Sequence, residues 1–245
     1  MNQPGETLAT TVGPPSLSTT ASVTTFGSLA WIGWVWLIAA IVFTGILVAV
    51  GVWGELDESL WHTLGAGMQR WLFLVVGFTM VSEFGRMFLT NGVTRAQLAR
   101  SALVTMLALS ALGALFATLV YAAEGVVFDI HDWPHRIDET LVDGPGELGR
   151  IYIDNLLTVA AFFTSGWLLG ACYRSRERDE ANLLAIPCLF PAAAAQILLR
   201  GDAALFGFLD RLDLDTPVAL GMGVTAAVTA LGAVAADHLT RQYVL

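Results

Sequence analysis

The chain has 245 residues, of which 56% are hydrophobic and 13% charged, with a formal net charge of −9 and a mean hydropathy of +0.66. Soluble domains are about 25% charged, so this composition excludes an ordinary water-soluble domain. All 12 basic residues are arginine. Because a P-loop and a Schiff base both need a lysine, the chain has no Walker A site for ATP and cannot hold retinal or pyridoxal phosphate through such a bond.

Six apolar stretches are long enough to cross a membrane as helices, since a span needs about 20 mostly apolar residues. Residues 1–27 precede them, are rich in Thr, Ser, Pro and Gly, and predict a disordered tail. Residues 28–245 then form one all-α transmembrane domain. The predicted spans are 30–53, 71–89, 101–123, 149–172, 182–200 and 216–236.

Arginine in the short connections predicts the orientation. Residues 90–100 and 173–181 are short and basic, whereas residues 54–69, 124–148 and 201–215 carry most of the acids. By the positive-inside rule the basic connections and both termini lie in the cytoplasm. We expect a multi-pass protein of a cell membrane, either a bacterial inner membrane or a plasma membrane.

The connection "TNGVTRAQLA", residues 90–99, contains a turn and a helix start. Asn91-Gly92 favours a turn, and Thr94 is suited to cap a following helix. We expect a short amphipathic helix along the membrane surface before the third span. Arg95 falls in its first turn, where the helix dipole disfavours a positive charge, which indicates a role other than helix stability.

Four polar residues lie in or beside the spans, where ionisable groups are costly and are functional candidates. Glu83 precedes Arg86 by three residues, so we expect these side chains to pair on one helix face. Asp154 lies roughly 6 Å inside its span, by helix rise. Gln196 follows Pro187 and Pro191, which predict a kinked fifth span. A proton relay through Glu83 or Asp154 is the alternative to structural pairing.

The segment 124–148 carries "DIHDWPH", in which Asp129, His131, Asp132 and His135 are of the types that bind zinc. Their spacing matches no known metal motif, so we expect a solvated loop with no metal. We expect interfacial helices here and at 208–215. The sequence contains no G-x-S-x-G or H-E-x-x-H signature, and we expect neither an enzyme nor a cofactor on this chain.

Three segments carry a resemblance to a known family: "FLTNGVTRAQLARSAL" (88–103), the acid Glu124 in "VYAAEG", and "GWLLGACYRSRERDEAN" (166–182). They resemble six-span permeases of the ABC-2 type. The resemblance implies a permease dimer, homodimeric or with a related subunit, that works as an exporter. The nearly charge-free spans would suit an apolar or amphipathic molecule. A separate P-loop ATPase subunit would carry ATP and magnesium. The coupling contact would comprise Gly92, Val93, Thr94, Arg95, Gln97 and Leu98.

Two other functions compete with this interpretation. One is a membrane anchor, receptor or immunity protein that binds a partner through its acidic loop. The other is an ion-coupled carrier that uses Glu83 or Asp154. Carriers often contain inverted repeats, and residues 30–123 and 149–236 show no convincing similarity to each other. The long acidic loop and the Thr-rich tail depart from the ABC-2 pattern and leave the transported molecule open.

Overall fold

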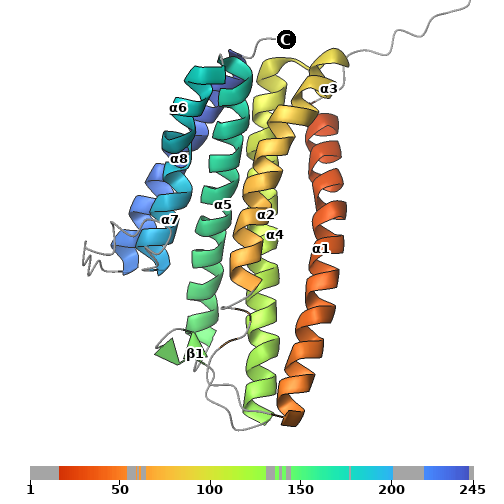
Figure 1. Cartoon of the computed structure of the whole chain (residues 1–245), viewed down its shortest axis with the longest axis vertical. Coiled ribbons are helices and arrows are strands. Elements are labelled where there is room, and N and C mark those ends of the chain that lie inside the picture. Colours follow the sequence, from red (N-terminus) through yellow and green to blue (C-terminus); the bar gives the residue numbers. More distant parts are fainter. Residues whose placement is uncertain are drawn as a thin grey trace, which may run out of the picture.

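The computed structural model describes residues 17–53, 59, 61, 65–130, 136–137, 140–141, 145–176, 178–200 and 218–242. Its helices run along the long axis of one bundle (Figure 1). They are α1 (Leu17–Trp53), α2 (Ala66–Thr79), the π-helix η2 (Met80–Phe84), α3 (Gly85–Thr90), α4 (Arg95–Ile130), α5 (Pro145–Ser175), α6 (Arg178–Cys188), α7 (Phe190–Arg200) and α8 (Val218–Arg241). Two short strands, β1 (Arg136–Ile137) and β2 (Thr140–Leu141), pair antiparallel.

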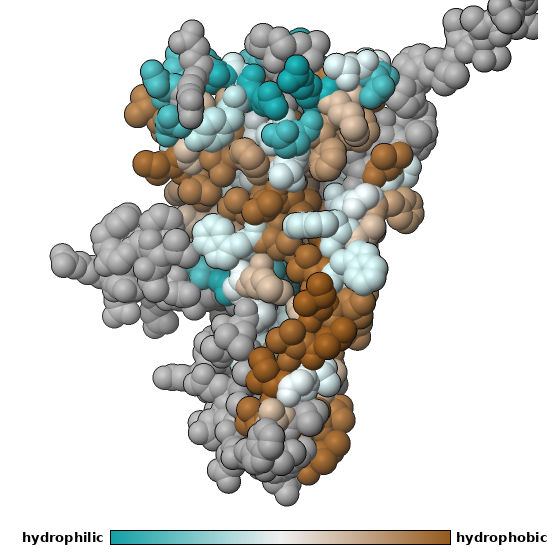
Figure 2. Space-filling model, turned by 45° about the vertical axis from the view of Figure 1, so that its right-hand side comes forward, coloured by the Kyte–Doolittle hydropathy of each residue, from teal (hydrophilic) through white to brown (hydrophobic). Residues whose placement is uncertain are grey.

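The prediction of a helical protein with six apolar spans is confirmed. The described part contains six helical stretches long and apolar enough to cross a membrane. These are Thr25–Ile46, Gly67–Thr90, Arg95–Ile130, Glu147–Ser175, Asp179–Leu199 and Ala219–Arg241. The hydrophilic residues of the face in Figure 2 gather at the end that holds the α3–α4 turn, and the surface below that end is largely apolar. This distribution is typical of a multi-pass membrane protein.

Helix α5 lies at the centre of the bundle and packs against α2, α4, α7 and α8. Its buried side chains Phe163 and Trp167 belong to the main core, together with Phe73 of α2. Helices α2 and α5 approach closely because glycines of one helix lie against the backbone of the other. A Cβ added at Gly166 of α5 would overlap the carbonyl oxygen of Leu74 in α2. Small residues permit such contacts where lipid supplies no hydrophobic drive.

Helix α1 packs along α4 in a parallel arrangement with a constant register. The hydroxyls of Thr25 and Thr105 lie 3.0 Å apart, and the rings of Trp36 and Phe116 stack with centroids 4.4 Å apart. Of the other α1 side chains that the structure describes, more than half, including Trp34, are exposed. Helix α1 therefore presents a large apolar surface to lipid or to a partner.

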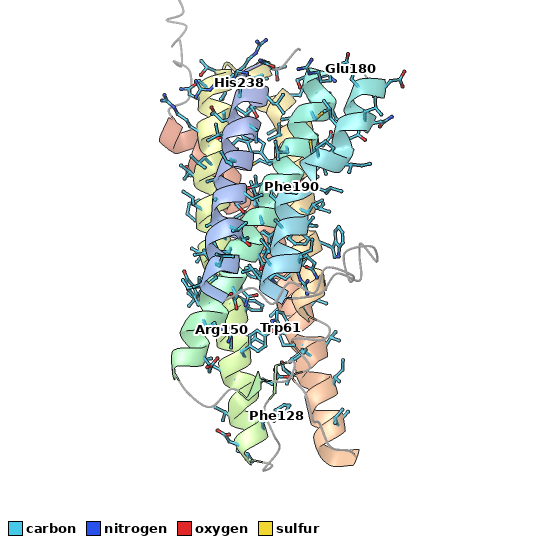
Figure 3. The ribbon with its side chains drawn as sticks, turned by 90° about the vertical axis from the view of Figure 1, so that its left-hand side faces the viewer. Trp61, Phe128, Arg150, Glu180, Phe190 and His238 are labelled. Carbon is cyan, nitrogen blue, oxygen red and sulfur yellow. The ribbon has the colours of Figure 1, made fainter. Side chains whose placement is uncertain are left out.

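A second, smaller core lies at the end of the bundle opposite the α3–α4 turn. It comprises the buried residues Phe43, Trp61, Tyr121 and Ile151. In Figure 3, Trp61, Arg150 and Phe128 lie at this end, and His238 and Glu180 lie at the other. The 36 residues of α4 extend roughly 54 Å. Because a hydrocarbon core is about 30 Å thick, α4 is longer than one crossing requires.

Two predicted features of the N-terminal half are wrong. Residues 17–27 are not a disordered tail but the first turns of α1, since an apolar span already nucleates the helix and each added Thr costs only tenths of a kcal/mol. Residues 1–16 lie outside the described residues. The separate surface helix at 90–100 is also wrong, because Arg95–Arg100 are the first turns of one continuous α4. No proline or glycine interrupts the good helix formers there.

In the C-terminal half, the predicted kink of the fifth span is confirmed. The interfacial helix predicted in 124–148 is not. The fifth span breaks at Leu189 into α6 and α7. Ala192 N–H then donates to Ser165 Oγ of α5 at 3.0 Å, which satisfies a backbone group at the break. Residues 124–130 extend α4, and the β1–β2 ladder replaces the interfacial helix expected in 124–148. The segment 208–215 lies outside the described residues.

Candidate functional site

The α3–α4 connection is a rigid turn built by Gly92. Its φ is +84°, in the left-handed region that only glycine adopts without strain. Gly92 N–H donates to Leu89 O at 3.2 Å, and Val93 N–H donates to Phe88 O at 3.1 Å. These two bonds form a Schellman motif, which satisfies the last carbonyls of α3 and reverses the chain.

A reciprocal capping box starts α4 immediately after this turn. Gln97 N–H donates to Thr94 Oγ1 at 3.2 Å, and Thr94 N–H donates to Gln97 Oε1 at 2.9 Å. The predicted cap at Thr94 is therefore confirmed. Val93 and Leu98 flank the box, and both are buried, as in a hydrophobic staple. Bonds to both adjoining helices thus define the conformation of the turn.

The exposed part of the turn is smaller than the six residues assigned by resemblance. Gly92, Thr94 and Arg95 are exposed, whereas Val93 and Leu98 are 3% and 0% exposed. A partner can therefore touch the first three, while Val93 and Leu98 act inside the protein by holding the turn. Gln97 is half-buried, and its side chain is engaged in the capping box.

This end of the bundle carries an unbalanced positive charge. Arg86, Arg95 and Arg100 are exposed and form no ion pair with any described residue. Arg176, in the α5–α6 connection, instead lies 3.8 Å from Glu180. The free guanidinium groups of α3 and α4 can bind a carboxylate surface bidentately.

Glu83 and Arg86 do not pair, contrary to the prediction. Glu83 lies in η2, where the wider π-helical turn removes the three-residue stacking of an α-helix. Its carboxylate lies 3.9 Å from Arg174 of α5 and is 69% exposed. Arg174 also donates through Nε and Nη2 to Ser82 O, at 2.9 and 2.5 Å. Arg174 thus ties the π-helix to α5.

Asp154 and Gln196 both have side-chain partners. Asp154 is one turn from Arg150 in α5, with Oδ2 and Nε 3.9 Å apart. Gln196, in α7, is 4% exposed and accepts from Arg70 Nη1 of α2 at 2.5 Å. The Arg70–Gln196 bond joins two helices that are distant in sequence, which residue spacing could not predict.

Glu124 is a buried carboxylate in the second core. It is 1% exposed and accepts from Ser59 Oγ at 2.6 Å and from Trp61 N–H at 3.4 Å. The sequence indicates the acid at the end of the third span but not the residues it contacts. Its position indicates a structural role, which is to hold residues 59 and 61 against α4.

The predicted functional residues do not assemble into one centre. Within the described residues, no three His, Cys, Asp or Glu side chains are close enough to hold a metal ion. Of the "DIHDWPH" group, His131, Asp132 and His135 lie outside those residues. Comparisons of the chain with protein-family models, with curated proteins and with solved structures found no match.

Proposed function

We propose that the chain is the membrane-spanning permease subunit of an ATP-driven transporter of the ABC type. It works as an exporter of an apolar or amphipathic molecule and as a dimer with two copies of a separate ATPase. The observation that carries the proposal is the rigid, exposed and basic turn at Gly92–Arg95 between two spanning helices. Because the chain has no lysine, any P-loop must belong to another subunit.

The turn can transmit a displacement from the ATPase to the spanning helices. The Schellman motif and the capping box join α3 and α4 without a flexible linker. Helix α4 then continues unbroken for 36 residues, so a displacement at Arg95 moves it as one body. On the other side, η2 interrupts the second span, and π-helical turns frequently occur at functional sites. Closure of the ATPase dimer would tilt α4 while the second span bends at η2.

Association with the ATPase depends on Arg95 in this scheme. The charge reversal Arg95→Glu replaces an attractive contact with repulsion, and we expect co-purification of the ATPase to fall at least tenfold, the loss expected for removing a charged hydrogen bond. The experiment isolates the tagged chain from its native membranes and quantifies any P-loop ATPase that accompanies it. Arg176→Glu is the matched control, because it makes the same charge change in the other connection at this end.

Two results would contradict the proposal. One is that no P-loop ATPase accompanies the wild-type chain, which would favour the anchor, receptor or immunity function. The other is that Arg95→Glu retains the ATPase as well as the wild type does. Equal losses in Arg95→Glu and Arg176→Glu would also count against a specific contact at the turn.

An ion-coupled carrier is the second candidate, and the position of Glu83 favours it. Glu83 is exposed in a π-helix and lines a cavity of about 460 Å³ between α1 and the second span. A carrier would lose transport in Glu83→Gln while any bound ATPase remained bound. In the permease scheme, Glu83→Gln removes only a 3.9 Å ion pair with Arg174 and leaves transport nearly unchanged.

A further inference from the structure

A cavity of about 620 Å³ lies between α4, α5 and α8. Binding pockets for small molecules have volumes of roughly 300–1,000 Å³. Leu103, Leu107, Leu156 and Val234 are among the apolar residues that form its walls. Figure 3 shows α8 in front, beside α5 and α4, with His238 near the end that carries the α3–α4 turn. Leu107 and Val234 are exposed, so the cavity is a slot at the surface of the bundle, open to molecules dissolved in the membrane.

The mouth of the slot is positively charged. Arg100, Asp237 and Arg241 line it at the end of the bundle near the α3–α4 turn. Arg241 is neutralised by Asp237, with Nε–Oδ2 and Nη2–Oδ1 distances of 2.8 and 3.2 Å. Arg100 is exposed and has no ion pair among the described residues. One unpaired guanidinium thus remains at the mouth and can bind an anionic group.

Two buried hydroxyl groups lie deep in the same slot. Ser110 of α4 is 1% exposed and Thr229 of α8 is 6% exposed, and both line the cavity. Neither hydroxyl has a hydrogen-bond partner among the described residues. Buried polar groups are normally satisfied, so two such groups on residues that line one cavity point to a ligand that bonds to them once each side chain turns toward it.

The two hydroxyls lie at similar depths below the charged mouth. Ser110 is ten residues beyond Arg100, which is roughly 15 Å along α4. Thr229 is twelve residues before Arg241, which is roughly 18 Å along α8. With the charged mouth at the membrane boundary, both lie close to the middle of a hydrocarbon core about 30 Å thick. A plain acyl chain could fill the apolar slot. It has no polar group at this depth, so it could not form a hydrogen bond with either hydroxyl.

We infer that this slot binds an anionic amphiphile that carries a hydrogen-bonding group partway along its apolar body. The anionic end binds Arg100, the apolar body lies between α4, α5 and α8, and the second polar group bonds to Ser110 and Thr229. The inference concerns binding alone and does not depend on ATP-driven transport, so it stands or falls separately from the permease proposal.

Stearate and 12-hydroxystearate test the inference, because they differ only in a hydroxyl group far along the chain. Native mass spectrometry of the purified full-length chain in detergent measures the bound fraction of each. We expect the wild type to bind 12-hydroxystearate roughly fivefold more tightly, as one additional hydrogen bond would give. The double variant Ser110→Ala, Thr229→Val removes that preference and leaves stearate binding unchanged.

The role of the positive charge is tested with Arg100→Gln. We expect this variant to bind both ligands roughly tenfold more weakly and to keep the preference for 12-hydroxystearate. Arg86→Gln is its control, since Arg86 is an exposed arginine near the same end but outside the slot. Thr118→Val controls the hydroxyl variants, since Thr118 of α4 bonds to Ala114 O and does not line the slot. Equal binding of the two ligands by the wild type overturns the inference, as does unchanged binding in Arg100→Gln or an equal effect in either control.

Discussion

At the residue scale, the α3–α4 turn shows which features of the site can be predicted from residues that are close together in the sequence. Asn91-Gly92 predicts the turn because glycine tolerates a positive φ, and Gly92 has φ +84°. Thr94 predicts the cap because its hydroxyl can accept a nearby N–H. The pairing of Glu83 with Arg86 failed because it assumed α-helical spacing, and nothing local in "VSEFGR" reveals the π-helix.

The capping box predicts the effect of one hydroxyl on stability. Thr94→Ala removes the acceptor for Gln97 N–H at the start of α4, and we expect it to lower the free energy of unfolding by about 1 kcal/mol. Thermal unfolding of the purified protein in detergent measures this. Thr94→Ser retains the hydroxyl and should restore most of the stability.

The matched control is Thr90→Ala, because Thr90 lies at the same turn but bonds only to carbonyls within its own helix. A loss in Thr90→Ala as large as that in Thr94→Ala would show that the cap is not the cause.

At the element scale, the contact between α2 and α5 depends on glycines whose partners are distant in sequence. Gly166 and Gly170 have the G-x-x-x-G spacing of close helix packing, so the sequence holds a signal for this face. It does not indicate that the face packs against α2, where Gly77 meets the backbone of Phe163. Hydropathy describes each helix alone, whereas pairing depends on complementary shape.

The glycine contact predicts a large effect from one methyl group. Gly166→Ala would drive a Cβ into the backbone of Leu74, and we expect a loss of about 1–3 kcal/mol as the helices separate. The unfolding midpoint in detergent measures it. Gly67→Ala in α2 is the control, since an added Cβ there meets nothing within 4 Å. If both variants unfold at the wild-type temperature, the close approach of α2 and α5 is not important for stability.

At the scale of the whole molecule, the start of α1 and the end of α8 lie toward the same end of the bundle, as six crossings require (Figure 1). The α3–α4 turn lies at that end, and the second core with Trp61 lies at the other. The arginine distribution predicts that the turn faces the cytoplasm.

Single cysteines test the orientation, because the native Cys172 and Cys188 are both buried. Asn91→Cys places a thiol at the exposed α3–α4 turn, and Gly149→Cys places one at the opposite end, where an added Cβ meets nothing within 4 Å. In intact cells we expect a membrane-impermeant thiol reagent to label Gly149→Cys. Asn91→Cys should react only after the membrane is opened. The reverse pattern would invert the orientation and remove the turn from reach of a cytoplasmic ATPase.

The sequence by itself determined the helical membrane class, the six spans, the break near Pro187 and Pro191, and the turn and cap at Gly92 and Thr94. Each depends on hydropathy or on bonds between residues a few positions apart. Only the tertiary structure decided that Val93 and Leu98 are buried, that Glu83 faces Arg174, and that Arg100, Ser110 and Thr229 share one cavity. These relations arise from packing between distant segments, and no local pattern encodes which helix faces which.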